Sequence, residues 1–83
     1  MSTILLSLKI RGKTEVVYDG DVKSVTSTNE KGSFDIIPYH THFVSIVKEQ
    51  IIIIDQNDKS TKIPVERGIV WVKDNKVEIY VGL

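Results

Sequence analysis

Two histidines, His40 and His42, are the side chains of this sequence best suited to bind a metal ion. Alternate residues of an extended segment point to the same side, so both imidazoles could share one ion, with the nearby carboxylate of Asp35 as a further ligand. Zinc normally uses three or four protein ligands, and a His-x-His pair alone is a nonspecific signal. The sequence therefore favours loop histidines that serve packing, hydrogen bonding or a partner, and we expect no metal or other cofactor.

Motifs typical of catalysis do not occur in the chain. A G-x-S-x-G turn would indicate a serine hydrolase and G-x-x-x-x-G-K-[ST] a phosphate-binding loop, and neither pattern is present. Asp19 and Asp21 could form a pair of catalytic carboxylates, but aspartates on either side of a glycine ordinarily bond to their own backbone in a turn. We therefore expect a protein that is not an enzyme.

The composition favours a small β-protein. Valine (11), isoleucine (12) and threonine (6) supply 29 of the 83 residues, while alanine is absent, and β-branched side chains fit a pleated sheet better than a helix. A chain of this length buries only about 60–65% of its unfolded surface, so we expect one domain over residues 1–83. Eleven basic and eleven acidic residues cancel, so the molecule as a whole lacks the long-range attraction to phosphate that underlies most nucleic-acid binding. This balance does not exclude a local basic patch. Without cysteine, stability must come from packing.

Short alternating stretches predict strands along the whole chain. Leu6, Leu8 and Ile10 alternate with polar residues, the pattern of a strand with one face in a core. Further strands are expected at residues 16–18, 22–26, 34–36, 43–47, 51–54, 63–65, 69–72 and 77–81. Turns are expected at residues 19–21, 27–32, 56–60 and 74–75. Since no helical period occurs, the pattern predicts an all-β, two-sheet sandwich or small barrel of about eight to ten short strands.

An OB-fold barrel of similar size would bind nucleic acid by stacking bases on aromatic side chains. The six candidates are Tyr18, Phe34, Tyr39, Phe43, Trp71 and Tyr80. They do not cluster with basic residues, and Phe34 and Phe43 lie in apolar strands, where core packing is the usual role. A stand-alone β-barrel module that binds nucleic acid or protein remains the alternative function.

One segment indicates a family more specifically than the alternation of apolar and polar residues does. Residues 32–40, Gly-Ser-Phe-Asp-Ile-Ile-Pro-Tyr-His, resemble the G-x-[LF]-x-[IV]-[LIY]-P-x-H signature of the epsilon (mitochondrial delta) subunit of rotary F-type ATP synthases. Two further pieces, Val17-Tyr18-x-Gly20-x-Val22 and Gly68-Ile69-Val70-x-Val72, have the family's order and spacing. The resemblance runs from about residue 6 to residue 81 and covers the family's N-terminal β-sandwich of two five-stranded sheets. The two-helix hairpin that usually follows has no counterpart in this sequence.

The resemblance implies a non-catalytic rotor subunit of the central stalk, which links the gamma subunit to the membrane ring and supports the coupling of ion translocation to ATP synthesis. Such a subunit is held peripherally at the cytoplasmic side of the cell membrane through its complex, without nucleic-acid binding or direct membrane insertion. By position, the ring-facing loop corresponds to Glu30, Lys31, Gly32 and Ser33. The gamma-facing surface corresponds to Gly12, His40 and Ser45.

The sequence departs from the family pattern in two loops. The family commonly has P-G-H-A-P where this chain has Pro-Tyr-His-Thr-His at residues 38–42, and Gln50 stands where a glycine often precedes the next strand. Next to the first of these loops, Ser45 is flanked by Val44 and Ile46. On a strand it should point to the opposite face from both neighbours, so we expect it to be the exposed residue of the three.

Overall fold

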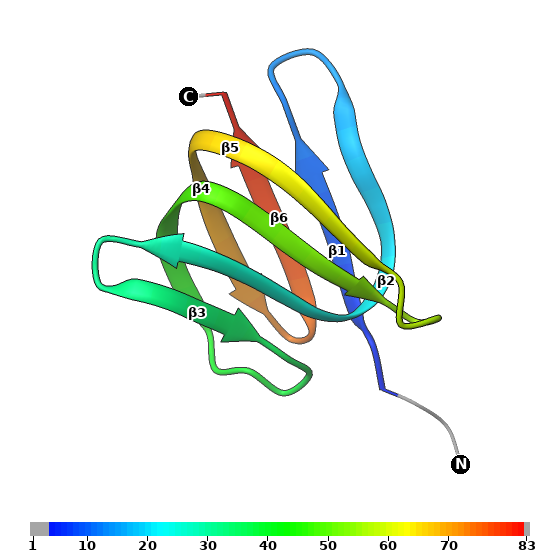
Figure 1. Ribbon diagram of the computed structural model, residues 1–83. Coiled ribbons are helices and arrows are strands. Elements are labelled where there is room, and N and C mark those ends of the chain that lie inside the picture. Colours follow the sequence, from blue (N-terminus) through cyan, green and yellow to red (C-terminus); the bar gives the residue numbers. More distant parts are fainter. Residues whose placement is uncertain (1–3, 83) are drawn as a thin grey trace.

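The computed structural model describes residues 4–82, and these residues form six β-strands and no helix (Figure 1). The strands are β1 (Leu6–Arg11), β2 (Val16–Asn29), β3 (Gly32–Ile36), β4 (Phe43–Asp55), β5 (Ser60–Lys73) and β6 (Lys76–Val81). Strands β2, β4 and β5 have 14, 13 and 14 residues, more than twice the usual length of about 5–6. All three curve strongly along their length (Figure 1), so each can belong to two sheets.

The pairing order is β1-β6-β5-β4-β2-β3, and β1 also pairs with β2. The first half of β2 pairs with β1, whereas its second half pairs with β3 and β4. The pairing registers shift between Val22 and Ser24 of β2 and between Val47 and Glu49 of β4. The five-stranded sheet therefore contains β1, β6 and one half of each long strand, and the four-stranded sheet contains β3 and the other halves. The predicted two-sheet sandwich is confirmed, with nine short segments among the described residues, six of which are halves of continuous strands.

The core lies between the two sheets and follows the period-2 pattern of the sequence. In β1, Leu6, Leu8 and Ile10 are fully buried and their polar neighbours are not. The fourteen apolar core residues are Leu6, Leu8, Ile10, Val22, Val25, Ile36, Val47, Ile51, Ile53, Val65, Val70, Val72, Val77 and Ile79. Each buried side chain of this size contributes about 1.5–3 kcal/mol relative to exposure. Because every strand contributes to this one cluster, the two sheets resist sliding over each other.

The turn predicted at residues 19–21 is wrong, because β2 continues through it. Gly20 is paired with Leu8 of β1, and a Cβ atom at Gly20 would lie 3.6 Å from the Tyr18 ring. The glycine therefore makes room for an aromatic ring over the strand, a role that glycines in strand interiors often have. The loop predicted at residues 27–32 is also too long. Strand β2 continues to Asn29 and β3 begins at Gly32, so the turn contains only residues 30–31.

Two features predicted from the sequence are confirmed, the sheet edge at Pro64 and the corner at Gly68. Pro64 lies in the half of β5 that pairs only with β4, at a sheet edge where its missing N–H costs no ladder hydrogen bond. Gly68 lies where β5 passes from one sheet to the other, and a Cβ atom there would collide with the carbonyl oxygen of Tyr80 and lie 3.0 Å from Val47 Cγ2. Only glycine lets β5 and β6 approach this closely.

Candidate partner-binding surfaces

The predicted ring-facing residues form the tip of the β2–β3 hairpin. Glu30, Lys31, Gly32 and Ser33 are all exposed. Asn29 shapes the tip, because its side-chain oxygen accepts a hydrogen bond of 2.8 Å from the Lys31 N–H. Gly32 has a φ of 123°, a conformation that essentially only glycine adopts at low cost. The hairpin therefore presents one acidic and one basic side chain on a tightly defined turn.

The predicted gamma-facing Gly12 lies in the β1–β2 connection. Its N–H donates a hydrogen bond of 2.8 Å to the carbonyl of Glu15, which closes a tight turn. The preceding residue, Arg11, is the register partner of Tyr80 near the end of β6. Gly12 thus marks one end of the five-stranded sheet.

His40 lies in the β3–β4 connection, at the opposite end of that sheet (Figure 1). The His40 N–H donates to the carbonyl of Ile37 at 3.1 Å, which places Pro38 and Tyr39 at the two central positions of a turn. Tyr39 has a φ of 67°, and a positive φ after a proline is the mark of a type II turn. Tyr39 thus adopts a backbone conformation that glycine adopts at lower cost.

The ring of His40 is held by its neighbours. Its Nδ1–H donates to the carbonyl of Thr41 at 2.8 Å, and the ring packs edge-on against Phe43 at a centroid distance of 5.4 Å. Phe43 packs in turn against Phe34 at 5.4 Å. These contacts brace the loop, so the imidazole has a fixed orientation.

The hypothetical metal site at His40, His42 and Asp35 is not assembled. His42 Nε2 lies 3.4 Å from a carboxylate oxygen of Asp74, whereas Asp35 accepts a hydrogen bond from the hydroxyl of Thr26. Within residues 4–82, no three His, Cys, Asp or Glu side chains are grouped to hold a metal ion. The two histidines serve the loop and its contact with the β5–β6 turn.

The expected exposure of Ser45 is reversed in the structure. Val44 is 65% exposed, while Ser45 is half-buried, with its hydroxyl accepting a hydrogen bond of 3.0 Å from the Asn29 amide. The same hydroxyl donates to the carbonyl of Ile46 at 3.0 Å. Ser45 therefore supports the β2–β3 hairpin, and Val44 is the residue that faces solvent.

The three predicted gamma-facing residues do not form one cluster. They lie around an exposed apolar surface on the five-stranded sheet that the sequence reasoning missed. Its four residues are Val44 (65% exposed), Ile69 (39%), Trp71 (56%) and Tyr80 (37%). The available signal was that Trp71 stands between the core residues Val70 and Val72, so strand alternation placed a large aromatic side chain on the solvent side.

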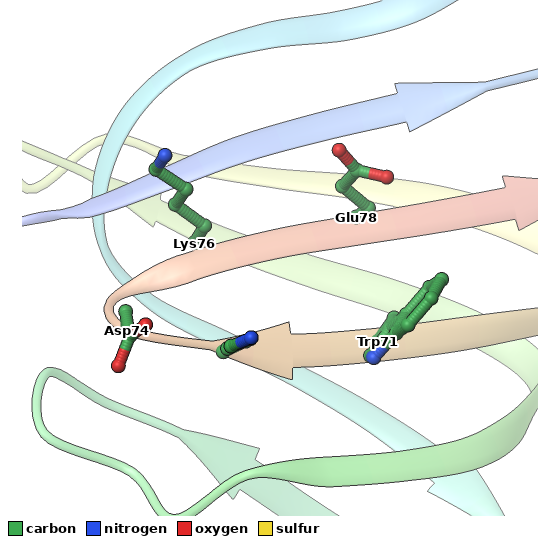
Figure 2. A pocket seen from close by; sticks show the side chains of 5 residues that line it. Trp71, Asp74, Lys76 and Glu78 are labelled. Atoms are coloured by element: carbon green, nitrogen blue, oxygen red, sulfur yellow. The ribbon is translucent and has the colours of Figure 1, made fainter.

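Around Trp71, the β5–β6 hairpin carries charged side chains (Figure 2). A shallow pocket there is lined by Trp71, Lys73, Asp74, Lys76 and Glu78. At the other end of β6, the Tyr80 hydroxyl donates to Glu78 at 3.0 Å. This hydrogen bond, together with the negative charge of Glu78, raises the pKa of Tyr80. The Glu78 carboxylate therefore accepts a hydrogen bond from its own strand.

None of residues 4–82 belongs to an apolar helix of membrane-spanning length.

Comparisons with known proteins agree with this architecture. The family model described as ATP synthase, Delta/Epsilon chain, beta-sandwich domain matches residues 5–82. The ATP synthase epsilon chain of Sulfurimonas denitrificans is 31% identical over 77 residues, which are 92% of this chain and 59% of that protein. The epsilon chain of Nitratiruptor sp. is 36% identical over 72 residues, 86% of this chain and 56% of that protein. This chain thus spans less than two thirds of the length of these relatives.

Solved structures share the fold at low sequence identity. A chain of the Euglena gracilis mitochondrial ATP synthase (OSCP/F1/c-ring) matches with a TM-score of 0.86 and 16% identity, covering 93% of this chain and 50% of that one. A chain of the Tetrahymena thermophila mitochondrial ATP synthase (central stalk/c-ring) matches with a TM-score of 0.76 and 18% identity, covering 92% and 62%. The family model and the curated relatives together establish that this chain belongs to the ATP synthase delta/epsilon family and forms its β-sandwich domain.

Proposed function

We propose that this chain is a non-catalytic rotor subunit in the central stalk of an F-type ATP synthase. In this role it links the gamma subunit to the membrane ring and supports the coupling of proton or other ion translocation to ATP synthesis. The observation that carries the proposal is the family match over residues 5–82. The curated relatives are named ATP synthase epsilon chain, and one matching structure is titled as a central stalk with its ring. The subunit would lie peripherally at the cytoplasmic side of the membrane.

The architecture suits a mechanical coupling element. Close-packed interiors deform little under load, and three strands run continuously from one sheet into the other. A force applied at the β2–β3 hairpin would therefore reach the five-stranded sheet through covalent backbone as well as through the core. In this proposal Glu30, Lys31, Gly32 and Ser33 contact the ring, and Gly12, His40 and Ser45 lie in or near the contact with gamma.

The aromatic side chains do not favour the alternative of an OB-type nucleic-acid module. Phe34 and Phe43 pack against each other and against the core. Tyr39 lies beside the β5–β6 turn, whereas Tyr80 lies near the other end of β6, opposite Arg11 of β1. The aromatic rings therefore do not line one groove.

The proposal is tested by mixing the purified chain with the cognate gamma subunit at micromolar concentration and measuring the mass of the product by size-exclusion chromatography with light scattering. We expect a one-to-one complex. Separate elution of the two proteins would contradict the proposal. The ring contact is tested separately by adding purified ring to this complex, with Glu30→Lys/Lys31→Glu as the variant. The control is Lys62→Glu, an exposed residue on the opposite edge of the same four-stranded sheet.

A further inference from the structure

The tip of the β2–β3 hairpin extends past the ladder that joins β2 to β4 (Figure 1). The register of β2 with β4 ends at Thr28, opposite Lys48, because β4 passes there from one sheet into the other. The next residue, Asn29, pairs in register with Gly32 of β3. A two-stranded hairpin has little stability of its own in water. The position of the tip therefore depends on contacts that its side chains make.

The side chain of Asn29 connects this tip to the five-stranded sheet. Its oxygen accepts a hydrogen bond of 2.8 Å from the Lys31 N–H, and its amide group donates one of 3.0 Å to the Ser45 hydroxyl. Ser45 pairs with Val70 in the half of β4 that belongs to the five-stranded sheet. The Ser45 hydroxyl donates in turn to the carbonyl of Ile46 at 3.0 Å. Hydrogen bonds thus run without interruption from the backbone of the tip to the backbone of the other sheet.

The two residue types suit this series of hydrogen bonds. An asparagine side chain carries an acceptor and a donor, and a hydroxyl can accept and donate at the same time. Asn29 and Ser45 are both half-buried, so water competes less for these groups than at an exposed site. Consecutive hydrogen bonds in such a site polarise and strengthen one another. The bond between Asn29 and Ser45 is therefore a stronger constraint than an isolated surface contact.

An apolar contact between the same two segments lies nearby. The ring of Phe34 in β3 packs edge-on against that of Phe43 in β4, with 5.4 Å between the ring centroids. Aromatic pairs tolerate centroid distances over a range of about 4.5–7 Å, whereas a hydrogen bond weakens steeply when its geometry changes. The ring pair thus holds the hairpin against β4, and the Asn29–Ser45 hydrogen bond determines where along β4 the tip lies.

We propose that the Asn29–Ser45 hydrogen bond fixes the hairpin tip on the five-stranded sheet, and that Asn29 is thereby a positioning residue for the contact with the membrane ring. This inference rests on the proposed function, in which residues 30–33 contact the ring and Ser45 lies in or near the contact with gamma. One hydrogen bond then connects the residues of the two partner contacts. A tip that is already held in its bound geometry loses less conformational freedom when the ring binds.

The position of the tip is tested on the chain alone. The sequence has no cysteine, so Lys31→Cys on the tip and Lys76→Cys on β6, both exposed positions, can be spin-labelled. Double electron–electron resonance then measures the distribution of distances between the two labels, which should be narrow in this labelled parent. Ser45→Ala removes the acceptor of the Asn29 amide and should broaden the distribution. Ser45→Thr keeps the hydroxyl and should leave the distribution narrow.

The matched control is Thr26→Val. The Thr26 hydroxyl donates to the carboxylate of Asp35, so this variant removes a side-chain hydrogen bond that joins β2 to β3 without reaching β4. The control should leave the distance distribution unchanged. Thermal unfolding of each variant checks that the fold is retained.

The contribution to the ring contact is measured as the Kd of the unlabelled chain for the purified ring, with gamma at saturating concentration. Asn29→Ala and Ser45→Ala should each weaken ring binding about three- to tenfold, the value of one neutral hydrogen bond. Ser45→Thr and Thr26→Val should stay within about twofold of the wild type. The double variant Asn29→Ala/Ser45→Ala should bind no more weakly than Asn29→Ala alone, because both residues act through the same bond.

An unchanged distance distribution in Ser45→Ala would overturn the inference and leave the proposed function standing. A broadened distribution with unchanged ring affinity would also overturn it, because the tip would then be positioned without benefit to the ring contact. Additive losses in the double variant would show that Asn29 and Ser45 act separately, which the inference excludes. If the wild-type chain with gamma does not bind the ring at all, the proposed function fails and the inference fails with it.

Discussion

The backbone N–H of Tyr39 donates a hydrogen bond of 2.6 Å to the side-chain oxygen of Asn75. This bond ties the β3–β4 connection to the β5–β6 turn, two segments far apart in the chain. Both residues have a left-handed backbone, with φ values of 67° for Tyr39 and 61° for Asn75. His42 and Asp74 make a second, longer contact between the same two segments. The side chains of Asp74 and Asn75, in the β5–β6 turn, thus hold the loop that carries His40.

Tyr39→Gly should stabilise the fold. A left-handed conformation costs an L-residue about 1–2 kcal/mol, while glycine loses about 0.5–1 kcal/mol of extra chain entropy on folding. The Tyr39 side chain is 76% exposed, so its removal sacrifices little packing. We expect a net gain of about 0.5 kcal/mol in the free energy of unfolding, measured by urea denaturation. The control Thr41→Gly, in the same loop but without a positive φ, should destabilise, and equal effects of both changes would refute the argument.

Asn75→Ala should destabilise the protein by about 1–2 kcal/mol, because alanine neither accepts the Tyr39 hydrogen bond nor tolerates the left-handed conformation well. Asn75→Asp keeps both the acceptor and a residue type that tolerates this conformation. It should therefore stay within about 0.5 kcal/mol of the wild type. Chemical denaturation measures both. Hydrogen exchange of the Tyr39 amide gives a local readout, which should accelerate in Asn75→Ala alone.

Gly68→Ala should be the most damaging of the glycine substitutions. The added methyl group would collide with the Tyr80 carbonyl, which belongs to the backbone and cannot move without disturbing the β5–β6 pairing at Ile69 and Val81. Forcing an extra methyl group into a filled site typically costs about 1–3 kcal/mol. Gly20→Ala is the matched control, since its new methyl group would find the Tyr18 ring at an ordinary 3.6 Å. Equal Tm values for the two variants in thermal unfolding would show that the close approach at Gly68 is not needed.

Particular residues show where the sequence alone decides the structure and where it does not. The sequence correctly predicts Leu6, Leu8 and Ile10 as core residues. Polar residues separate them, so strand alternation places all three on the same face. Val44 and Ser45 were misjudged because the outer face of this sheet is itself apolar, so hydropathy no longer distinguishes inside from outside. A glycine such as Gly20 indicates either a turn or a close approach of other atoms. The Tyr18 ring that distinguishes the two lies beside Gly20 only in the folded structure.

The candidate surfaces differ in how far sequence could define them. The tip at residues 30–33 is local, so a family signature is enough to place it. The exposed apolar residues Val44, Ile69, Trp71 and Tyr80 lie on β4, β5 and β6, and they become neighbours only through the register of the three strands. Exposed apolar residues on separate strands therefore needed the structure to be joined into one surface.

Glu78→Gln should lower the pKa of Tyr80. In the wild type the hydrogen bond from the Tyr80 hydroxyl to Glu78 is the first cause that raises this pKa above 10.0, followed by the charge of Glu78, whereas Arg11 acts in the opposite direction. A neutral amide removes the charge and leaves Arg11 to stabilise the phenolate. Absorbance of the phenolate during a pH titration measures the change, and subtraction of a Tyr80→Phe titration isolates this residue from Tyr18 and Tyr39.

The same pKa shift sets the direction of a stability change. Because the folded-state pKa of Tyr80 lies above its unfolded value, protonated Tyr80 favours the fold, and this contribution is complete below pH 10. It is lost as the pH rises through the folded-state pKa. Glu78→Gln should therefore lose less stability than the wild type over this alkaline range, as followed by urea midpoints at successive pH values. Parallel curves for the two proteins would mean that the Tyr80–Glu78 hydrogen bond is not maintained in solution.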